Sequence, residues 1–200
     1  MRKNNTSSSK MQKTVDEMMK NENERKTIAS QTLLHDYHAT VKKNTVQLPD
    51  GAIIKDFYTI TIPDAAMVAA ITEDGNILLK SEYRYACRES VIECPAGMIE
   101  PGEEPFAAAK RELLEETGYT STDWIYLGYT WESTSKLTNK MHLFVARNAT
   151  LTTGQHLDLN EHLEVMKVSL NDVVDMVMEG KINANSTAHL ILKVARDIGI

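Results

Sequence analysis

The feature that most constrains this chain is a segment over residues 97–119 in which glutamate, arginine and glycine recur at fixed spacings. Its middle carries the signals of one helix, because Pro105 stands near the start and Gly118 comes just past the end. Glu103 and Glu104 are expected in the first turn, where the helix dipole favours carboxylates. The segment therefore predicts a loop, a helix and a second loop in succession.

Three further glutamates of this helix, Glu112, Glu115 and Glu116, fall within an arc of about 100° on a helical wheel. The apolar side chains expected on the opposite side, facing a sheet, are Phe106, Ala107, Leu113 and Leu114. Carboxylates at this spacing repel one another by ~0.2–0.5 kcal/mol per pair, and the dipole disfavours anions in the last turn. A counterion is therefore expected, and ligands that are all oxygen suit Mg²⁺ or Mn²⁺. A solvated acidic face is the alternative.

The whole segment resembles the Nudix box, Gly-x5-Glu-x7-Arg-Glu-U-x-Glu-Glu-x-Gly-U, where U is bulky and apolar; the final U is Tyr119, a less usual choice. Similarity to Nudix hydrolases implies that divalent metals are held against a diphosphate. The implied metal ligands are the backbone carbonyl of Ala96 and the side chains of Glu112, Glu116 and Glu115. The residues with an implied structural role are Gly97 and Gly118, at tight turns, and Glu103 and Arg111, which would pair and brace the helix.

Two stretches before the helix, Ser81-Glu-Tyr-Arg-Tyr and Ile92-Glu-Cys-Pro-Ala-Gly, look like the ADP-ribose pyrophosphatase branch of this family. The likeness implies that Arg84 contacts a phosphate, a task that its fork of donors suits, and that Glu93 lies beside the metal site. A surface ion pair is the alternative for Arg84. Tyr83, Trp131 and Tyr129 are candidates to stack on an adenine base, with a place in the core or at its rim as the alternative.

A later stretch, residues 159–165, resembles the loop that supplies a catalytic glutamate in the same branch. Glu161 occupies the matching position and would orient or deprotonate the attacking water, as a general base does. Glu164 is the second choice, and Glu115 of the helix is the third carboxylate assigned to catalysis. A solvated loop acid is the alternative for Glu161 and Glu164.

The resemblance implies metal-dependent hydrolysis of the diphosphate bond of ADP-ribose, or of a related nucleoside diphosphate sugar, to AMP and a sugar phosphate. Two departures bear on the substrate: Thr134 stands at about the place of a usual proline, and Lys140 near that of a usual acid. The alternatives are a Nudix hydrolase for another nucleotide sugar or nucleoside diphosphate derivative and, more remotely, a sensor that binds ADP-ribose without cleaving it.

Strands precede and follow the central helix and further helices come last, so we expect an α/β (α+β) fold, a Nudix-type α/β/α sandwich with a mixed β-sheet. Residues 1–27 are expected to form a disordered tail and an amphipathic helix that starts at Met11. Residues 28–63 are expected to be a strand segment and 64–200 the hydrolase domain. The early strands, over 32–48 and 53–62, would leave an open edge. Since the branch exchanges such segments between subunits, we predict a homodimer with swapped N-terminal strands.

Composition narrows the classes of partner. The 200 residues carry a net charge of −6, which argues against nucleic-acid binding because that needs a basic face. No run approaches the ~20 apolar residues of a membrane span, and the first residues lack the apolar stretch of a secretory signal. We therefore expect no membrane partner and a cytoplasmic location, with Cys87 and Cys94 as reduced thiols.

Overall fold

The computed structural model describes residues 24–157 and 162–198, which divide into two compact units. The first unit comprises the chain up to Asp36 together with Thr40–Thr59. The second comprises Tyr37–Ala39 and the chain from Ile60 onward. No helix among the described residues combines the length and the apolar character needed to cross a membrane.

The first unit is a three-stranded sheet in the order β1-β2-β3. Its strands are β1 (Lys26–His35), β2 (Thr40–Gln47) and β3 (Ile53–Thr61). Every residue of β1 is exposed. The one buried polar side chain of β2, Asn44, accepts a hydrogen bond from Ser30 Oγ at 2.8 Å and donates to Thr59 Oγ1 at 3.0 Å. A polar contact thus links all three strands of this sheet.

The start of β1 corrects one expectation from the sequence. A helix was expected over residues 11–27, yet Lys26 and Thr27 already pair with Gln47 and Val46 of β2. Long-range strand pairing decides these two residues, and local helical spacing does not reveal it. Glu24 and Arg25 are in neither a helix nor a strand, and residues 1–23 of the expected tail and helix lie outside the described residues.

In the described part of the second unit, eight strands form one sheet whose main path is β11-β5-β4-β10-β8. Off this path, β6 pairs with β5, β7 with β4 and β9 with β10. The strands are β4 (Ala65–Thr72), β5 (Asn76–Arg84), β6 (Glu89–Glu93), β7 (Ala96–Met98), β8 (Tyr119–Thr120), β9 (Asp123–Trp131), β10 (Lys140–Leu151) and β11 (Leu163–Ser169). Since β4 and β10 run parallel while β4 and β5 run antiparallel, the sheet is mixed, as predicted.

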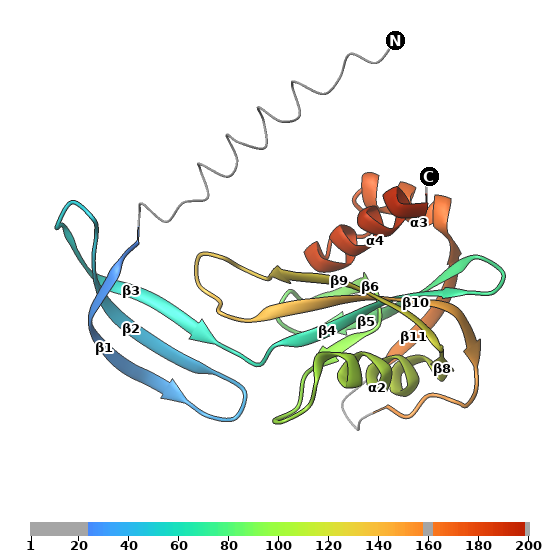
Figure 1. The fold of residues 1–200 in the computed structure, drawn as a ribbon, viewed down its shortest axis with the longest axis horizontal. Helices are drawn as coiled ribbons and strands as arrows, with labels where there is room; N and C mark the ends of the chain where they lie inside the picture. The colour runs from blue at the N-terminus through green and yellow to red at the C-terminus, as the bar shows by residue number, and fades with distance from the viewer. Residues whose placement is uncertain (1–23, 158–161, 199–200) are drawn as a thin grey trace, which may run out of the picture. The chain divides into compact units, whose positions relative to one another are not determined.

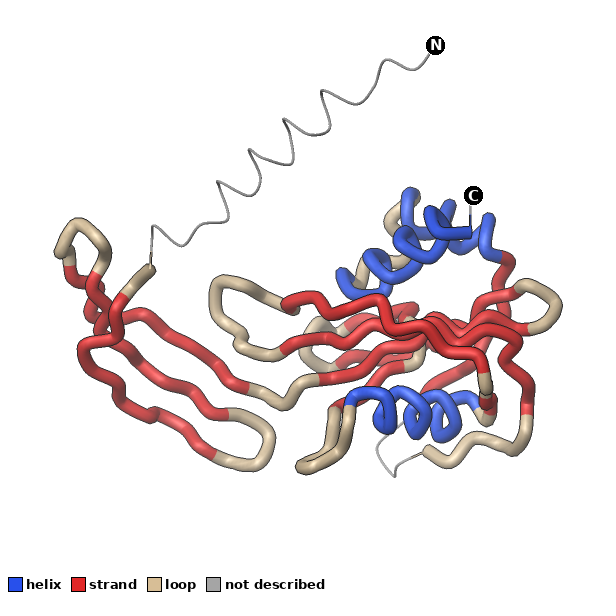
Figure 2. Tube along the Cα trace, viewed as in Figure 1, coloured by secondary structure: helices blue, strands red, loops and turns tan. Residues whose placement is uncertain are grey.

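Helices cover both faces of this sheet (Figures 1 and 2). They are α2 (Pro105–Thr117) on one face, and α3 (Leu170–Met178) and α4 (Asn185–Ile198) on the other. Side chains of the central strand β4 alternate between two cores: Val68 packs in the cluster that includes Leu113 of α2, and Met67 in the cluster that includes Leu190 of α4. The predicted α/β/α sandwich is confirmed.

Local chemistry explains most of the element boundaries. Ser169 caps α3 by accepting the Asp172 N–H, and Gly180, two residues past the end of this helix, adopts φ 76°. The strands β7 and β8 were not predicted, because elements of three and two residues are too short for a period to show. Cys87 and Cys94 are both free thiols, the first exposed and the second buried.

The face that α2 buries differs from the expected one. Its buried residues are Ala108, Ala109, Glu112, Leu113, Glu116 and Thr117, whereas Phe106 and Ala107 are exposed. The small side chains of Ala108 and Ala109 let the helix approach the sheet closely, which turns two of its glutamates inward. The prediction that the carboxylates lie opposite the anchoring face is therefore wrong. Glu103 and Glu104 also precede the first turn, since Glu104 is the N-cap residue.

Candidate active site

The two glycines that flank the acidic helix, Gly118 and Gly97, have different structural roles. Gly118 ends α2 in the left-handed conformation at φ 76°, and its N–H donates to Leu114 O at 2.8 Å, a termination that favours glycine. Gly97 in β7 has no such conformation. A Cβ at position 97 would overlap the Glu112 carboxylate. The expected tight turn at Gly97 is thus wrong, and the residue instead leaves room for Glu112.

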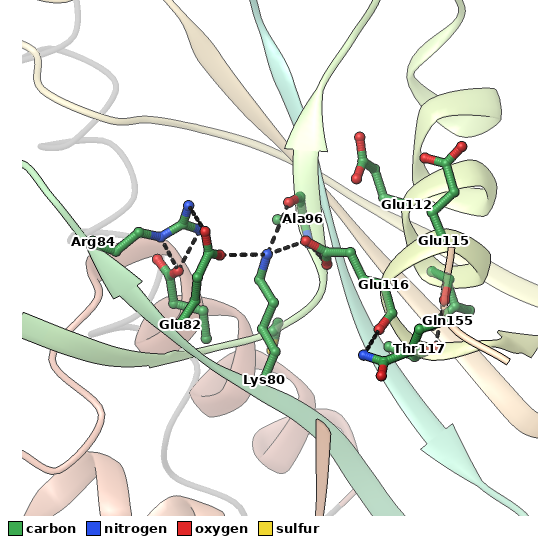
Figure 3. A network of polar contacts seen from close by, with 12 residues as sticks. Lys80, Glu82, Arg84, Ala96, Glu112, Glu115, Glu116, Thr117 and Gln155 are labelled. Carbon is green, nitrogen blue, oxygen red and sulfur yellow. Dashed lines mark hydrogen bonds and ion pairs between the residues drawn. The ribbon is translucent and has the colours of Figure 1, made fainter. Parts of the chain in front are cut away.

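Glu116 lies at the centre of a buried polar group formed with Lys80 of β5 (Figure 3). The carboxylate accepts the N–H of Ala96 at 3.0 Å and contacts the Lys80 ammonium. The Lys80 Nζ also lies 3.4 Å from the carbonyl oxygen of Ala96 and 3.4 Å from Glu82 Oε2. Only 1% of Lys80 and 2% of Glu116 is exposed. The buried pair brings α2, β5 and β7 together at one point.

Lys80 was not among the residues that the sequence singled out. The available signal was its position directly after Ile77, Leu78 and Leu79, an apolar run of the kind found in buried strands. A lysine that continues such an apolar run has to find an anionic partner if the strand is buried, because an unpaired buried ammonium is costly. This argument was open from the sequence, but it could not identify Glu116 as the partner.

Arg111 forms a second, more exposed polar group beside the first. Its guanidinium donates to both carboxylate oxygens of Glu103, at 3.0 and 2.9 Å, and to the carbonyl oxygen of Met98 at 2.9 Å. It also donates to Glu112 at 2.6 Å and to Glu115 at 3.1 Å. Charge-assisted, bidentate contacts of this kind are stronger than neutral ones. Arg111 therefore ties the loop before α2 to the carboxylates of the helix.

The loop after β10 holds the carboxyl end of the same helix. Gln155 Nε2 donates to the carbonyl oxygen of Glu116 at 2.7 Å, and the His156 N–H donates to that of Glu115 at 2.8 Å. These contacts satisfy carbonyls that have no partner within the helix. The loop thus fixes the turn that carries two of the glutamates.

The carboxylates of this site differ in the direction in which the protein shifts their pKa values. Burial raises the pKa of Glu116 to about 7, although the Lys80 ammonium acts in the opposite direction. Burial also raises the pKa of Glu112, against the influence of Arg111. By contrast, the hydrogen bond from Arg111 holds the pKa of Glu103 below its usual range. A bound cation would therefore strongly favour the ionised form of the two inner carboxylates, Glu112 and Glu116.

A cavity of about 750 Å³ opens beside these residues, within the usual size of a small-molecule site. The charged side chains that line it include Lys80, Glu82, Arg84, Arg111, Glu112 and Glu116. Backbone of Ala96 and Gly97 completes the same wall. Carboxylates and guanidinium groups therefore face one space, which suits a ligand that carries both phosphate and a bound cation.

The structure places Arg84 and one of its two ion-pair partners, Glu82, in the lining of this cavity. Its Nη2 lies 2.6 Å from Glu93 Oε2, and its Nη1 lies 3.1 Å from Glu82 Oε1. The Arg84 side chain is 39% exposed, so it keeps access to the cavity while it is paired. Glu93, expected beside the metal site, is bound to Arg84.

The aromatic candidates lie elsewhere. Tyr83 and Trp131 are 58% and 45% exposed, and neither lines the 750 Å³ cavity. Trp131 lines a separate hollow of about 370 Å³ together with Thr134. Its ring meets that of Tyr129 edge-on at 5.7 Å, and Lys140 Nζ lies within 6 Å of both rings. The structure therefore does not gather the predicted adenine-stacking rings around the carboxylates.

Of the two later glutamates proposed for catalysis, only Glu164 is among the described residues. Glu164 lies in β11 opposite Ser81 of β5, and it is exposed. It lines a hollow of about 350 Å³ that is separate from the cavity beside Lys80. Glu161 lies outside the described residues.

The donors on this wall, Glu112, Glu116 and the carbonyl of Ala96, fit a hard divalent cation in their chemistry because all are oxygen ligands, as is the neighbouring Glu115 of α2. Across residues 24–157 and 162–198, however, no three His, Cys, Asp or Glu side chains converge into a group that could hold a metal by themselves. Lys80 contacts Glu116, and Arg111 contacts Glu112 and Glu115. A cation bound here would therefore share these carboxylates with the protein's own positive charges.

A mixed sheet between helices, with a glutamate-bearing helix that meets one cavity, is the architecture of a Nudix-type hydrolase. The family model described as "NUDIX domain" matches residues 61–190. The chain therefore belongs to the Nudix family, and its box residues lie inside the matched range. Both the family and the assignment as a Nudix hydrolase, predicted from the sequence, are confirmed, and members of this family generally use divalent metal ions.

Two curated relatives and one solved structure show the extent of the similarity. An ADP-ribose pyrophosphatase of Bacillus subtilis is 32% identical over 169 residues, which covers 84% of this chain and 91% of the relative. A methanol dehydrogenase activator of Bacillus methanolicus is 30% identical over 165 residues, or 82% and 89% of the two chains. A crystal structure titled as an ADP compounds hydrolase superposes with a TM-score of 0.73 at 22% identity, covering 88% of this chain and 96% of the other. The last comparison supports the fold alone.

Proposed function

We propose that this Nudix hydrolase cleaves the diphosphate bond of ADP-ribose, or of a related nucleoside diphosphate sugar, to give AMP and a sugar phosphate. The observation that carries the proposal is the cavity in which inward carboxylates and the Arg84 guanidinium face the same space. The similarity to an ADP-ribose pyrophosphatase over most of both chains supports this choice of substrate.

The residues of the cavity wall and their neighbours on α2 each have a proposed task. Glu112, Glu115, Glu116 and the carbonyl of Ala96 would hold Mg²⁺ or Mn²⁺. Such an ion, when bound, screens phosphate oxygens, polarises phosphorus and acidifies a water. Arg84 would exchange part of its pairing with Glu93 for a phosphate, which its planar fork of donors can bind through two contacts. Arg111 and Glu103 would hold the helix in position.

A general base is still needed to take the proton of the attacking water. The proposal retains Glu161 in this role, with Glu164 and Glu115 as the other carboxylates assigned to catalysis. Glu161→Gln, Glu164→Gln and Glu115→Gln separate them, since loss of the base lowers kcat far more than it changes KM. The variant with the largest fall in kcat at constant KM identifies the base.

The substrate is tested with a panel of compounds. The pure protein is incubated with Mg²⁺ and ADP-ribose, ADP-glucose, GDP-mannose, NADH or a diadenosine polyphosphate, and the products are separated by chromatography. AMP and ribose 5-phosphate from ADP-ribose, at the highest kcat/KM of the panel, is the expected result. A higher kcat/KM on another compound would replace the substrate. Tight binding of ADP-ribose without any product would favour the sensor.

Another nucleotide sugar or nucleoside diphosphate derivative is the second candidate substrate. The stretch that includes Thr134 lacks the expected proline, and Thr134 lies with Trp131 in a hollow outside the main cavity. A relative of similar length and identity is named as a methanol dehydrogenase activator. A different nucleoside diphosphate derivative is therefore the alternative that the panel addresses.

We also propose a homodimer in which the N-terminal strands are exchanged. β1 is exposed along its whole length and displays Ile28, Leu33 and Leu34, each 49–52% exposed, which is unusual for apolar residues of a strand in a folded monomer. Light scattering at micromolar concentration should give twice the chain mass of 22.5 kDa. A monomer in solution would exclude the exchange. The cytoplasmic location stays a prediction.

A further inference from the structure

The position of Lys80 carries an inference about the cations of this site. Its ammonium group lies among three oxygen acceptors, namely the Glu116 carboxylate, the carbonyl of Ala96 and the Glu82 carboxylate (Figure 3). Two of these, Glu116 and Ala96, also belong to the donor set proposed for a divalent metal. The lysine therefore occupies space and ligands that a metal ion would use.

The burial of Lys80 shows that this placement is not a surface contact that solvent could replace. The residue is 1% exposed, and it follows Ile77, Leu78 and Leu79, each of which is 0% exposed. Moving an ammonium group from water into such a place costs several kcal/mol unless anions and dipoles compensate it. Its carboxylate and carbonyl contacts provide that compensation, so Lys80 is held in place from three directions.

Both carboxylate oxygens of Glu116 are likewise engaged. One of its carboxylate oxygens contacts Lys80, and the other accepts the N–H of Ala96 at 3.0 Å. By contrast, Glu112 is bonded to Arg111 through one oxygen, and the Glu115 side chain is 42% exposed. Glu112 and Glu115 are thus more open to an added ion than Glu116.

We propose that Lys80 is a built-in cation of this active site, which fills the cation position between Ala96 and Glu116 and leaves divalent ions to the side of Glu112 and Glu115. The inference rests on the proposed metal-dependent function and narrows its ligand set, since Glu116 and the carbonyl of Ala96 then hold Lys80 in place of one divalent ion. Lys80 is then a positioning residue: it balances Glu116 and keeps β7 against α2. A chain without this ammonium group has one additional place for a divalent ion.

Counting bound Mn²⁺ tests the proposal. The native chain and Lys80→Met are titrated with Mn²⁺ at pH 8, and free Mn²⁺ is measured by electron paramagnetic resonance. Methionine keeps the length of the side chain and removes its charge. Lys80→Met should bind one more Mn²⁺ per chain than the native protein. Equal numbers would overturn the proposal, and so would the absence of bound Mn²⁺ in both. Lys110→Met, at an exposed lysine of α2, is the matched control and should bind the native number.

A second measurement uses the native chain, so it decides the matter even if Lys80→Met does not fold. Lysines are reductively methylated with formaldehyde, with and without saturating Mg²⁺, and each site is quantified by mass spectrometry. Lys80 should stay unmodified in both conditions, while the exposed Lys110 is modified in both. Modification of Lys80 that appears only with Mg²⁺ would mean that the metal displaces the ammonium group, and the proposal would be wrong.

These readouts do not depend on turnover. If the chain leaves ADP-ribose intact but Lys80→Met still gains a Mn²⁺ site, the substrate proposal fails and the role of Lys80 stands. If ADP-ribose is hydrolysed with Mg²⁺ while both proteins bind the same number of ions, the proposed function stands and the role of Lys80 fails.

Discussion

Two charged groups meet on the last turns of α2, and they differ in how the protein treats its carboxylates. Around Lys80, Glu116 is 2% exposed and both of its oxygens are engaged by donors from β5 and β7. Around Arg111, Glu115 is 42% exposed and has one contact to the guanidinium. Burial raises the pKa values of the inner carboxylates Glu116 and Glu112, whereas the hydrogen bond from Arg111 lowers that of Glu103 in the outer group. The difference suggests that the buried glutamates serve chemistry at a cost in stability, and that the contact between Arg111 and Glu103 supports the fold.

The sharpest test of this division compares two adjacent glutamates. Glu116→Gln should lower kcat/KM by ~10²-fold or more, because it leaves the buried Lys80 charge unbalanced and frees β7 from α2 beside the proposed metal ligands. Glu115→Gln makes the same chemical change one residue away, at an exposed proposed metal ligand whose place water can take, and should cost about ten times less. Steady-state kinetics with Mg²⁺ in excess gives both values. Near-native activity in Glu116→Gln, or equal losses in the two variants, would remove the distinction.

The next largest effect is expected at Gly97, because a side chain there meets the inner group directly. A Cβ at this position would overlap the Glu112 carboxylate. In Gly97→Ala, Glu112 has to move away from β7, so Mg²⁺ affinity and kcat/KM should each fall by ~10-fold or more. Gly102→Ala is a control at a glycine with nothing near its Cβ, although its φ of 83° adds some strain. Isothermal titration with Mg²⁺ measures the affinity, and an unchanged value in Gly97→Ala would contradict the steric role.

The helix α2 shows which features of the site could be predicted from the sequence. Its spacing of Gly, Glu and Arg was enough to predict the helix, the family and the glutamates, because these depend on local periodicity and on a specific pattern. The orientation of the helix was predicted wrongly, because Glu112 and Glu116 turn toward the sheet only when cations elsewhere in the chain compensate them. Lys80 lies 36 residues before Glu116, and no local pattern connects the two.

The strands also divide into those with a local sequence signal and those set by long-range pairing. Apolar runs and turn residues in the sequence predict strands over 67–71, 77–81 and around 124–131, close to the observed β4, β5 and β9. The early start of β1, by contrast, depends on its pairing with the end of β2. The position of the aromatic candidates could not be predicted for a related reason. Tyr83 and Trp131 have the right chemistry to stack on a base, yet only the sheet geometry decides that neither lines the main cavity.

Removing Arg111 should test the outer group by stability. Arg111→Ala deletes the hydrogen bonds to Glu103, Glu112, Glu115 and Met98, and charge-assisted bonds of this kind support an expected loss of about 2 kcal/mol in the free energy of unfolding. For a chain of this length, the melting temperature should fall by about 4–8 °C. Arg147→Ala, which breaks the exposed pair with Asp123, should change it by less than about 4 °C. Lost activity at an unchanged melting temperature would mean that Arg111 acts in the chemistry and does not brace the helix.

The smallest effect concerns the pH dependence of the same outer group. The hydrogen bond from Arg111 lowers the pKa of Glu103 in the folded chain below its ordinary value of 4.5. Folding therefore favours the ionised form, and the resulting stability is present above pH 4.5 and is lost as the pH falls through the lowered pKa. The melting temperatures of the native chain and Glu103→Gln should differ by a constant amount above about pH 5 and converge below pH 4.5. Glu104→Gln, at an N-cap residue whose side chain makes no capping bond, gives the baseline for removing one carboxylate nearby. A gap between native and Glu103→Gln proteins that widens toward low pH would contradict the assignment, because it would require the Glu103–Arg111 contact to favour the protonated acid.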